Sequence, residues 1–370
     1  MGPRRAGPPQ PRPGVPLSRR ELGAARGRGA RRQRPLALAR RPHRGRGHGD
    51  VGEPGPVSRP LVGVDLGGSL IRAAVATGPA THGTPVRHPT PAGGAVAVLD
   101  AIAAGVLEAT AGVAPAGVAI GVPGPVDPRT GLVYAAPNLH GWEGIEAGRL
   151  LADRLGCPVA VQNDANLAAF AEWTAGAGRG TRDFVFLTVS TGVGGGLILD
   201  GELVTGAAGT AGELGHVPAD LDGPPCGQGH AGCLEGIASG TAIADRARAA
   251  LAAGERSRLA AVGDSLDARD VQAAAEAGDA LAGRLFDEAG RALGRAIGGI
   301  VNVLSPEVVA IGGGLLGAGE LLFTPLRAAI GEIAFAVPLR RCRVVPAALG
   351  TDAGLVGATA WAVRRFTAEG

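Results

Sequence analysis

An amide next to a carboxylate, and three glycine clusters, are the features of this sequence that could do chemistry. Asn163 and Asp164 follow the sequence Val-Ala-Val-Gln at 159–162, which predicts a strand, and they precede a stretch with helical character. A carboxylate there can accept the proton of a hydroxyl group and align its oxygen for attack on a phosphorus atom. Asp164 could also cap the helix predicted from Ala165, because Asp is favoured at that position. The two roles are compatible.

Each glycine cluster follows an apolar run that predicts a strand. Glycine lets backbone N–H groups approach an anion closely, and an Asp at a strand end can hold a hydrated magnesium ion. A hairpin turn explains any one cluster equally well, but three clusters roughly 125 residues apart fit a nucleotide bound between two lobes. The first two clusters would face its phosphates and the third its adenosine. The residues assigned to the nucleotide are Asp65, Gly67, Gly68, Ser69, Thr191, Gly192, Gly194, Gly312, Gly313 and Gly314.

The basic residues are all arginine, which excludes two classes of enzyme. A P-loop needs a lysine at the β- and γ-phosphates, and a Schiff-base enzyme needs a lysine amine. The charge is also uneven, because residues 1–60 hold fifteen arginines and three acidic residues. That segment carries a net charge of +12, while the whole chain carries only +3.

Residues 1–59 are dominated by Pro, Gly and Arg without apolar periodicity, which predicts a disordered tail. Three interpretations remain open: a solvated tail or upstream extension, a nucleic-acid-binding tail, and a degenerate helix-turn-helix. The run 17–22 could open a helix-turn-helix, but the following Gly-Arg repeats lack the apolar spacing that two packed helices need.

Composition sets the remaining bounds. With 45% hydrophobic residues and 64 glycines among 370, the chain can build a large core with many turns. No run of about 18 apolar residues predicts a membrane span, and the first residues lack the apolar core of a secretory signal. Four cysteines argue against a disulfide framework, so we expect a cytoplasmic protein.

The predicted elements form a mixed α/β protein of two lobes, residues 60–181 and 182–370, with a duplicated α/β core. Two positions are open for the last helix, on the second lobe or back on the first. Strands are predicted at 61–65, 71–76, 118–122, 159–162, 184–189, 197–199 and 308–311, and helices at 95–109, 150–155, 165–175, 242–252, 268–275 and 280–304.

From residue 60 to about 362 the chain resembles the ROK family of sugar kinases and related repressors. The resemblance implies the two-lobed actin/hexokinase/Hsp70-like ATPase fold. It rests on motifs whose order and separation agree with the family: Asp65–Ser69, Gly121–Asp127, Pro137-Asn138 with Trp142, Asn163–Asn166, Thr191–Gly196, Glu213–His216 and Gly232–Glu235.

The resemblance assigns roles to individual residues. Asp164 matches the family's catalytic base. The positions that match the family's sugar contacts are Asn138, Asn163, Glu213, His216 and Glu235, while Gly121 would let the backbone approach the ring.

The resemblance also implies a zinc site. The family pattern has a His ten residues before Cys-x-Cys-Gly-x-x-Gly-Cys, which His216, Cys226 and Cys233 match in spacing. Gln228 occupies the position of the middle Cys, and His230 could complete a four-ligand site if the loop adjusts. The alternative is a loop held by packing, with two free thiols.

The resulting hypothesis is an ATP- and magnesium-dependent sugar kinase, a phosphotransferase with an alcohol acceptor. Glucose is the first substrate guess, and other hexoses remain open. The alternative is a sugar-responsive transcription regulator of the same family that uses the basic N-terminal segment to bind DNA. A homo-oligomer, dimer or tetramer, is the family-level expectation, with no membrane partner.

Overall fold

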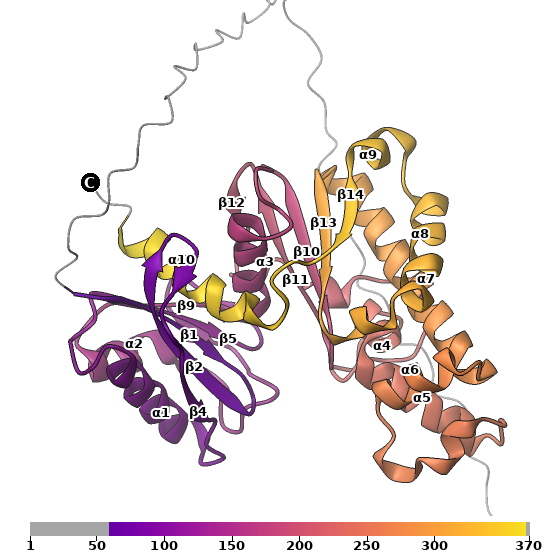
Figure 1. Ribbon diagram of the computed structural model, residues 1–370, viewed down its shortest axis with the longest axis horizontal. Coiled ribbons are helices and arrows are strands. Elements are labelled where there is room, and N and C mark those ends of the chain that lie inside the picture. Colours follow the sequence, from indigo (N-terminus) through magenta and orange to yellow (C-terminus); the bar gives the residue numbers. More distant parts are fainter. Residues whose placement is uncertain (1–58, 368–370) are drawn as a thin grey trace, which may run out of the picture. The chain divides into compact units, whose positions relative to one another are not determined.

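The computed structural model describes residues 59–367, whose strands build two large sheets and one small sheet (Figure 1). The predictions for the basic segment 1–59 therefore lie outside the described residues, apart from Arg59. None of the helices in the described range has the length and apolar character needed to cross a membrane.

The first sheet runs in the order β3-β2-β1-β5-β9, and β4 also pairs with β2. β1 is antiparallel to β2 but parallel to β5, and β5 is parallel to β9. A small sheet, β6-β7-β8, lies in the same half of the chain. The strands are β1 (Leu61–Leu66), β2 (Leu70–Gly78), β3 (Thr81–His82), β4 (Val86–Pro89), β5 (Gly117–Val122), β6 (Val126–Asp127), β7 (Leu132–Val133), β8 (Ile145–Glu146) and β9 (Val159–Asn163).

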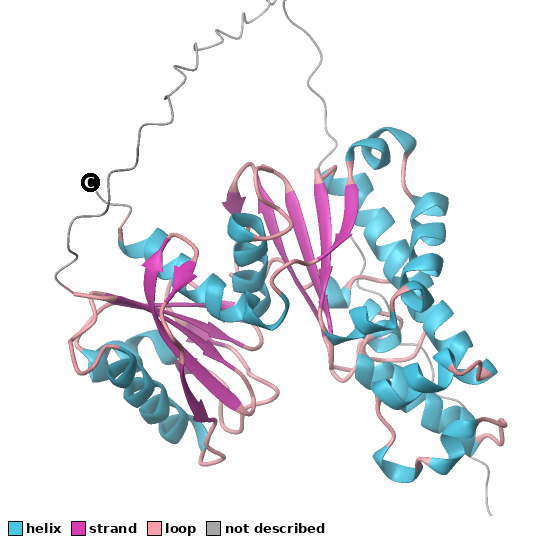
Figure 2. Cartoon of the chain, in the orientation of Figure 1, coloured by secondary structure: helices cyan, strands magenta, loops and turns pink. Residues whose placement is uncertain are grey.

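The second sheet repeats this plan in the order β12-β11-β10-β13-β14. β10 is antiparallel to β11 and parallel to β13, and β13 is parallel to β14. The duplicated core predicted from the sequence is therefore present, as a hairpin followed by two parallel strands in each sheet (Figure 2). The strands are β10 (Phe184–Val189), β11 (Val193–Leu199), β12 (Glu202–Leu203), β13 (Val308–Gly312) and β14 (Arg343–Pro346).

Alternation of side chains along β1 decides what covers each face of the first sheet. Val62 and Val64 point into a core shared with α1 (Gly94–Ala109) and α2 (Ala147–Leu155). Leu61 points the other way, toward Ala362 of the last helix α10 (Ala353–Phe366). Gly63 permits this contact, because a Cβ there would lie 2.3 Å from the backbone nitrogen of Thr359.

Two helices pack against each other where the two halves of the chain meet. α3 (Asp164–Ala175) contributes Phe170 to a core with Phe184 and Phe186 of the second sheet. α10 crosses α3 closely, since a Cβ at Gly357 would lie 2.0 Å from the carbonyl oxygen of Leu167. The chain passes between the two sheets twice, after α3 and again between β14 and α10.

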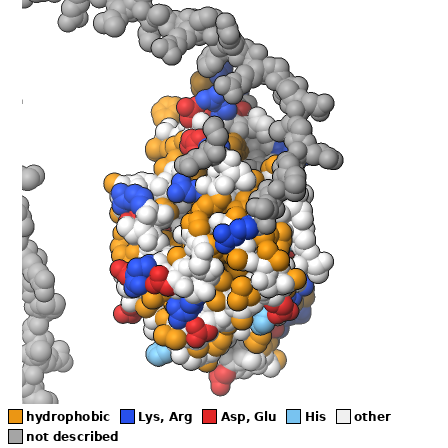
Figure 3. Space-filling model, turned by 90° about the vertical axis from the view of Figure 1, so that its left-hand side faces the viewer, with side chains coloured by type: hydrophobic (Ala, Val, Ile, Leu, Met, Phe, Trp, Pro, Cys, Tyr) orange, Lys and Arg blue, Asp and Glu red, His pale blue; other side chains and the backbone are white. Residues whose placement is uncertain are grey.

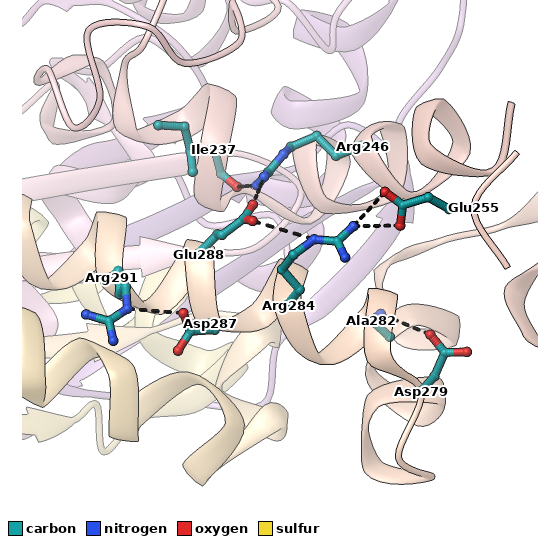
Figure 4. Close-up of polar contacts among 9 residues, drawn as sticks. All are labelled: Ile237, Arg246, Glu255, Asp279, Ala282, Arg284, Asp287, Glu288 and Arg291. Carbon is teal, nitrogen blue, oxygen red and sulfur yellow. Dashed lines mark hydrogen bonds and ion pairs between the residues drawn. The ribbon is translucent and has the colours of Figure 1, made fainter. Parts of the chain in front are cut away.

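The other face of the second sheet is covered by helices with a large apolar core. Ion pairs tie two of them together on the surface: Glu288 pairs with Arg246 and Arg284, and Arg284 also bonds Glu255 at 2.7 Å (Figure 4). The helices of this half are α4 (Leu234–Ala238), α5 (Gly240–Ala252), α6 (Ala268–Glu276), α7 (Ala280–Leu304), α8 (Glu320–Ile333) and α9 (Ala336–Arg341).

On the face of the molecule that Figure 3 turns to the viewer, basic and acidic side chains lie interspersed among apolar ones wherever grey atoms do not cover it. No patch of one sign gathers on that visible part.

All six predicted helices are present, with starts that shift by up to three residues. The sequence did not predict α4, α8, α9, β14 or the short strands β3, β4, β6, β7, β8 and β12. The second glycine-rich turn is shorter than predicted, because β11 already begins at Val193. Gly194 therefore sits in a strand, where the ladder with β10 supports it.

Candidate functional site

Asp164 is held at the carboxyl end of β9, where α3 begins. The cap of this helix is Asn163, whose Oδ1 accepts a hydrogen bond from the N–H of Asn166 at 3.0 Å. The Nδ2 of Asn163 donates to the carbonyl oxygen of Gly124 at 3.0 Å. The capping role considered for Asp164 thus belongs to Asn163, and Asp164 is the first helical residue.

The surroundings of Asp164 raise its pKa to near neutral pH. Burial raises the pKa of Asp164 to about 7, and the negative charges of Asp65 and Glu213 act in the same direction. The N–H of Ala165, 2.8 Å from Oδ1, opposes them and lowers the pKa. The residue remains partly accessible to solvent. A carboxyl group in this state can accept a proton at neutral pH.

Asp65, at the end of β1, forms an ion pair that the sequence reading missed. Its Oδ2 accepts hydrogen bonds from Arg72 Nη2 at 2.6 Å and Nε at 3.0 Å. Arg72 also donates to the carbonyl oxygen of Thr351 at 2.8 Å, just before α10. The strand pairing could have revealed the partner, because Arg72 lies directly opposite Asp65 in the β1–β2 hairpin.

The first glycine turn, between β1 and β2, offers only part of the predicted anion cradle. The N–H of Gly67 closes the hairpin by donating to the carbonyl oxygen of Leu70 at 2.9 Å. The N–H groups of Gly68 and Ser69 have no partner within residues 59–367. A Cβ at Gly68 would lie 3.4 Å from the Cβ of Asn138, so the turn is adjacent to this predicted sugar contact.

The second glycine turn borders a cavity of about 410 Å³. Thr191 and Gly314 line this cavity together with residues of α5 and α6. Gly312 is buried in β13, and Gly313 lies against the backbone of Val189. The cavity therefore brings together Thr191 and Gly314, one residue from each of the second and third clusters, and the other predicted glycines of these clusters do not line it. Its volume lies within the usual range of small-molecule sites.

The start of α3 is packed between the two halves of the site. A Cβ at Gly194 of β11 would lie 3.0 Å from the Cβ of Ala165. A Cβ at Gly121 of β5 would lie 3.6 Å from the Cα of Asp164. A Cβ at Gly121 would also lie 3.0 Å from Cδ1 of Leu167, so α3 packs tightly on both β5 and β11 at these two glycines.

Three further predicted sugar contacts come from the loop that follows β12. Glu213 precedes a short 3-10 turn, Leu214–His216, which places His216 near it. Although Glu213 is exposed, loss of part of its hydration raises its pKa, and His216 opposes this rise. Glu235 accepts a hydrogen bond from the N–H of Val193 at 3.0 Å, so it ties α4 to the second glycine turn.

A cluster of nitrogen and sulfur atoms lies next to Glu235. Ligand atoms of His216, Cys226 and Cys233 all lie within 4.8 Å of one another. His230 lies beside two of them, with its Nδ1 3.4 Å from Nδ1 of His216 and 3.8 Å from Sγ of Cys226, but it does not belong to the group within 4.8 Å. Gln228 is exposed and makes no hydrogen bond within the described range.

Comparison with known proteins agrees with this geometry. A family model described as "ROK family" matches residues 61–365. The chain belongs to the ROK family. Its sheets and crossing helices are the two-lobed actin/hexokinase/Hsp70-like ATPase fold of this family's solved members.

Similar members of the ROK family include both enzymes and a regulator. A glucokinase of Thermotoga maritima is 37% identical, over 80% of this chain and 95% of its own. A solved Streptomyces griseus glucokinase in complex with glucose and AMPPNP has a TM-score of 0.69 and 35% identity, covering 82% of this chain and 99% of its own. A xylose repressor of Caldicellulosiruptor bescii is 31% identical, over 67% of this chain and 62% of its own.

Proposed function

We propose that this ROK protein transfers a phosphoryl group from ATP to a hydroxyl group of a hexose, with Asp164 as the general base. The observation that carries the proposal is the placement of Asp164, a partly accessible carboxyl group with a pKa of about 7, at the start of α3. The second glycine turn and its cavity lie on one side of α3, and the Asn138 and Glu213 loops supply polar groups for a sugar.

The residues of the site have separate parts in this reaction. Asp164 accepts the proton of the sugar hydroxyl and aligns its oxygen. The free N–H groups of Gly68 and Ser69 stabilise negative charge on the transferred group. One oxygen of Asp65 is bound to Arg72, which leaves Oδ1 for a hydrated magnesium ion. Magnesium, when bound, neutralises phosphate charge.

Zinc fits the cluster at His216. Zinc bond lengths to nitrogen and sulfur imply ligand-to-ligand distances of roughly 3.3 to 3.8 Å in a tetrahedral site. The pairs at 3.4 and 3.8 Å that His230 makes match these distances, and the third pair, His216 to Cys226, is 3.9 Å. We therefore propose His230, in place of Gln228, as the fourth ligand, which requires the loop to bring it closer to Cys233. The role of the site is to hold His216 and Glu235 in place for the sugar.

The test is release of ADP from ATP in the presence of a panel of hexoses, with the phosphorylated sugar identified by mass. Wild type should act on at least one hexose, and Asp164→Asn should lose nearly all turnover, by roughly 10³-fold or more. Asp153→Asn is the matched control, because Asp153 is an exposed carboxylate on α2 that pairs with Arg149. No turnover of any hexose by wild type would refute the proposal, and an active Asp164→Asn would refute the assigned base.

The regulator alternative rests on the basic segment 1–59, outside the described residues, and on the similarity to the xylose repressor. It predicts sequence-specific DNA binding that is lost when the chain starts at Val57. The full chain and this truncated chain can be compared in the same binding assay. Size-exclusion chromatography of the same samples tests the expected homo-oligomer.

A further inference from the structure

One buried carboxylate connects the two points where the chain passes between the sheets. Glu172 lies in the last turn of α3 and is 0% exposed. Its Oε2 accepts a hydrogen bond from the N–H of Ala177 at 2.9 Å, in the first crossing. Its Oε1 accepts from the N–H groups of Ala348 at 2.9 Å and Leu349 at 2.7 Å, in the second crossing.

The chain around Glu172 is shaped to admit this carboxylate. A Cβ at Gly176 would lie 2.1 Å from Oε2, so a larger residue would displace the carboxylate. The backbone carbonyl of Glu172 accepts hydrogen bonds from Gly176 and Gly178, which fixes the first crossing a second time. Trp173 adds a third tie, because its Nε1 donates to the carbonyl oxygen of Thr181 at 2.8 Å.

The charge of Glu172 has no ion-pair partner anywhere in the described range. Backbone N–H groups alone compensate it, and such charge-assisted hydrogen bonds are stronger than neutral ones. If a buried carboxylate loses even one of these donors, its desolvation is no longer compensated and the folded state is destabilised. The two crossings are therefore held in one fixed arrangement by a single side chain.

We infer that Glu172 is a positioning residue that couples the two crossings. Because it bonds both, they move together as one hinge when the two lobes close on substrate. The inference rests on the proposed kinase function for its link to catalysis. Asp164 and Glu172 stand at opposite ends of the same helix, α3. If the two crossings move together, closure brings Asp164 to one position relative to the second glycine turn. If they moved independently, that position would vary.

The test uses the full chain with Glu172→Gln, whose amide nitrogen would replace one of the two acceptor oxygens and face a backbone N–H donor. Glu172→Asp keeps the charge but is too short to reach both crossings, and it serves if the first variant does not fold. Glu202→Gln is the matched control, because the exposed Glu202 of β12 also joins the second sheet to α10, through Arg364 at 2.6 Å.

Hydrogen exchange is measured on peptides that cover 176–183 and 347–352, and steady-state kinetics are measured on the same samples. In the Glu172 variant we expect both peptides to lose protection together, with kcat reduced about tenfold or more and KM for the sugar changed about threefold or less. The control should match wild type in both readouts. Loss of protection in one peptide only, or in both with unchanged kcat, would overturn the inference. If wild type phosphorylates no hexose, the proposed function fails, but the exchange comparison still tests whether one side chain couples the two crossings.

Discussion

The two sheets of this protein share a strand plan but end in turns with different chemistry. The β1–β2 turn of the first sheet is preceded by a carboxylate, Asp65, paired with Arg72. In the second sheet the strand register places Thr188 where the first sheet has Asp65, and Ser190 and Thr191 of the β10–β11 turn border the cavity. The duplicated core thus supplies two similar glycine turns, of which the first lies beside the Asp65–Arg72 ion pair and the second borders a cavity; we propose that both bind phosphate.

The largest effect we expect on ligand binding comes from a side chain at Gly313, which lies against the end of β10 just before the second turn. Gly313 has φ of 94°, and a Cβ there would lie 2.2 Å from the carbonyl oxygen of Val189. Gly313→Ala should therefore displace the second turn and weaken nucleotide binding by roughly 100-fold, because backbone strain adds to the clash. Calorimetric titration with a non-hydrolysable ATP analogue measures this, and sugar binding should change little.

Gly319→Ala is the matched control for that variant. Gly319 also has a positive φ, 52°, but its Cβ would meet no atom within 4 Å. This control carries the strain without the clash, so its nucleotide affinity should stay within about threefold of wild type. Equal nucleotide affinity in both variants would remove the second turn from the nucleotide site.

A smaller effect, on the sugar and not on the nucleotide, is expected from a substitution in the loop that holds the sugar contacts. His230→Ala should lower bound zinc well below one per chain and raise KM for the sugar by about tenfold, because ligand loss loosens the loop around His216. Elemental analysis and kinetics measure the two effects. Gln228→Ala, in the same loop, should retain the metal and the sugar KM. Full zinc in His230→Ala would show that the site does not use this histidine.

The smallest effect concerns stability. The pKa of Asp164 in the folded protein, about 7, lies above its ordinary value of 3.8, so the folded state holds the proton more tightly than the unfolded state between these pH values. The contribution of Asp164 to stability is therefore present below about pH 4 and is lost as pH rises to 7. Asp164→Asn should become more stable than wild type across that window, by about 1 to 2 kcal/mol at pH 8. Thermal melts at several pH values measure this, and an unchanged difference from pH 4 to 8 would contradict it.

Most of the site could be predicted from the sequence because its parts are local. A strand followed by Asn163-Asp164, or by glycines, is a short contiguous motif that can be recognised without knowing where the strand lies in the sheet. The spacing of His216, Cys226 and Cys233 is likewise local in the sequence. The sequence could not reveal Arg72 as the partner of Asp65 without the hairpin register.

Glu172 was beyond reach for a different reason. Its partners Ala348 and Leu349 are 176 and 177 residues away and contribute only backbone N–H groups. Because any residue except proline supplies a backbone N–H, the residue types at 348 and 349 do not indicate that they bond Glu172. The sequence also did not predict α8, which contains Pro325, a residue that usually breaks a helix but is buried inside this one.

The most direct test of the central claim is the pH dependence of kcat/KM for the sugar, measured at saturating ATP with excess magnesium. If Asp164 is the base, activity should rise tenfold per pH unit below an apparent pKa near 7 and level off above it, because only the ionised carboxylate accepts the proton. A profile that stays flat down to about pH 5 would mean a base with an ordinary carboxyl pKa, and would contradict the assignment of Asp164 as a base whose pKa is raised by burial.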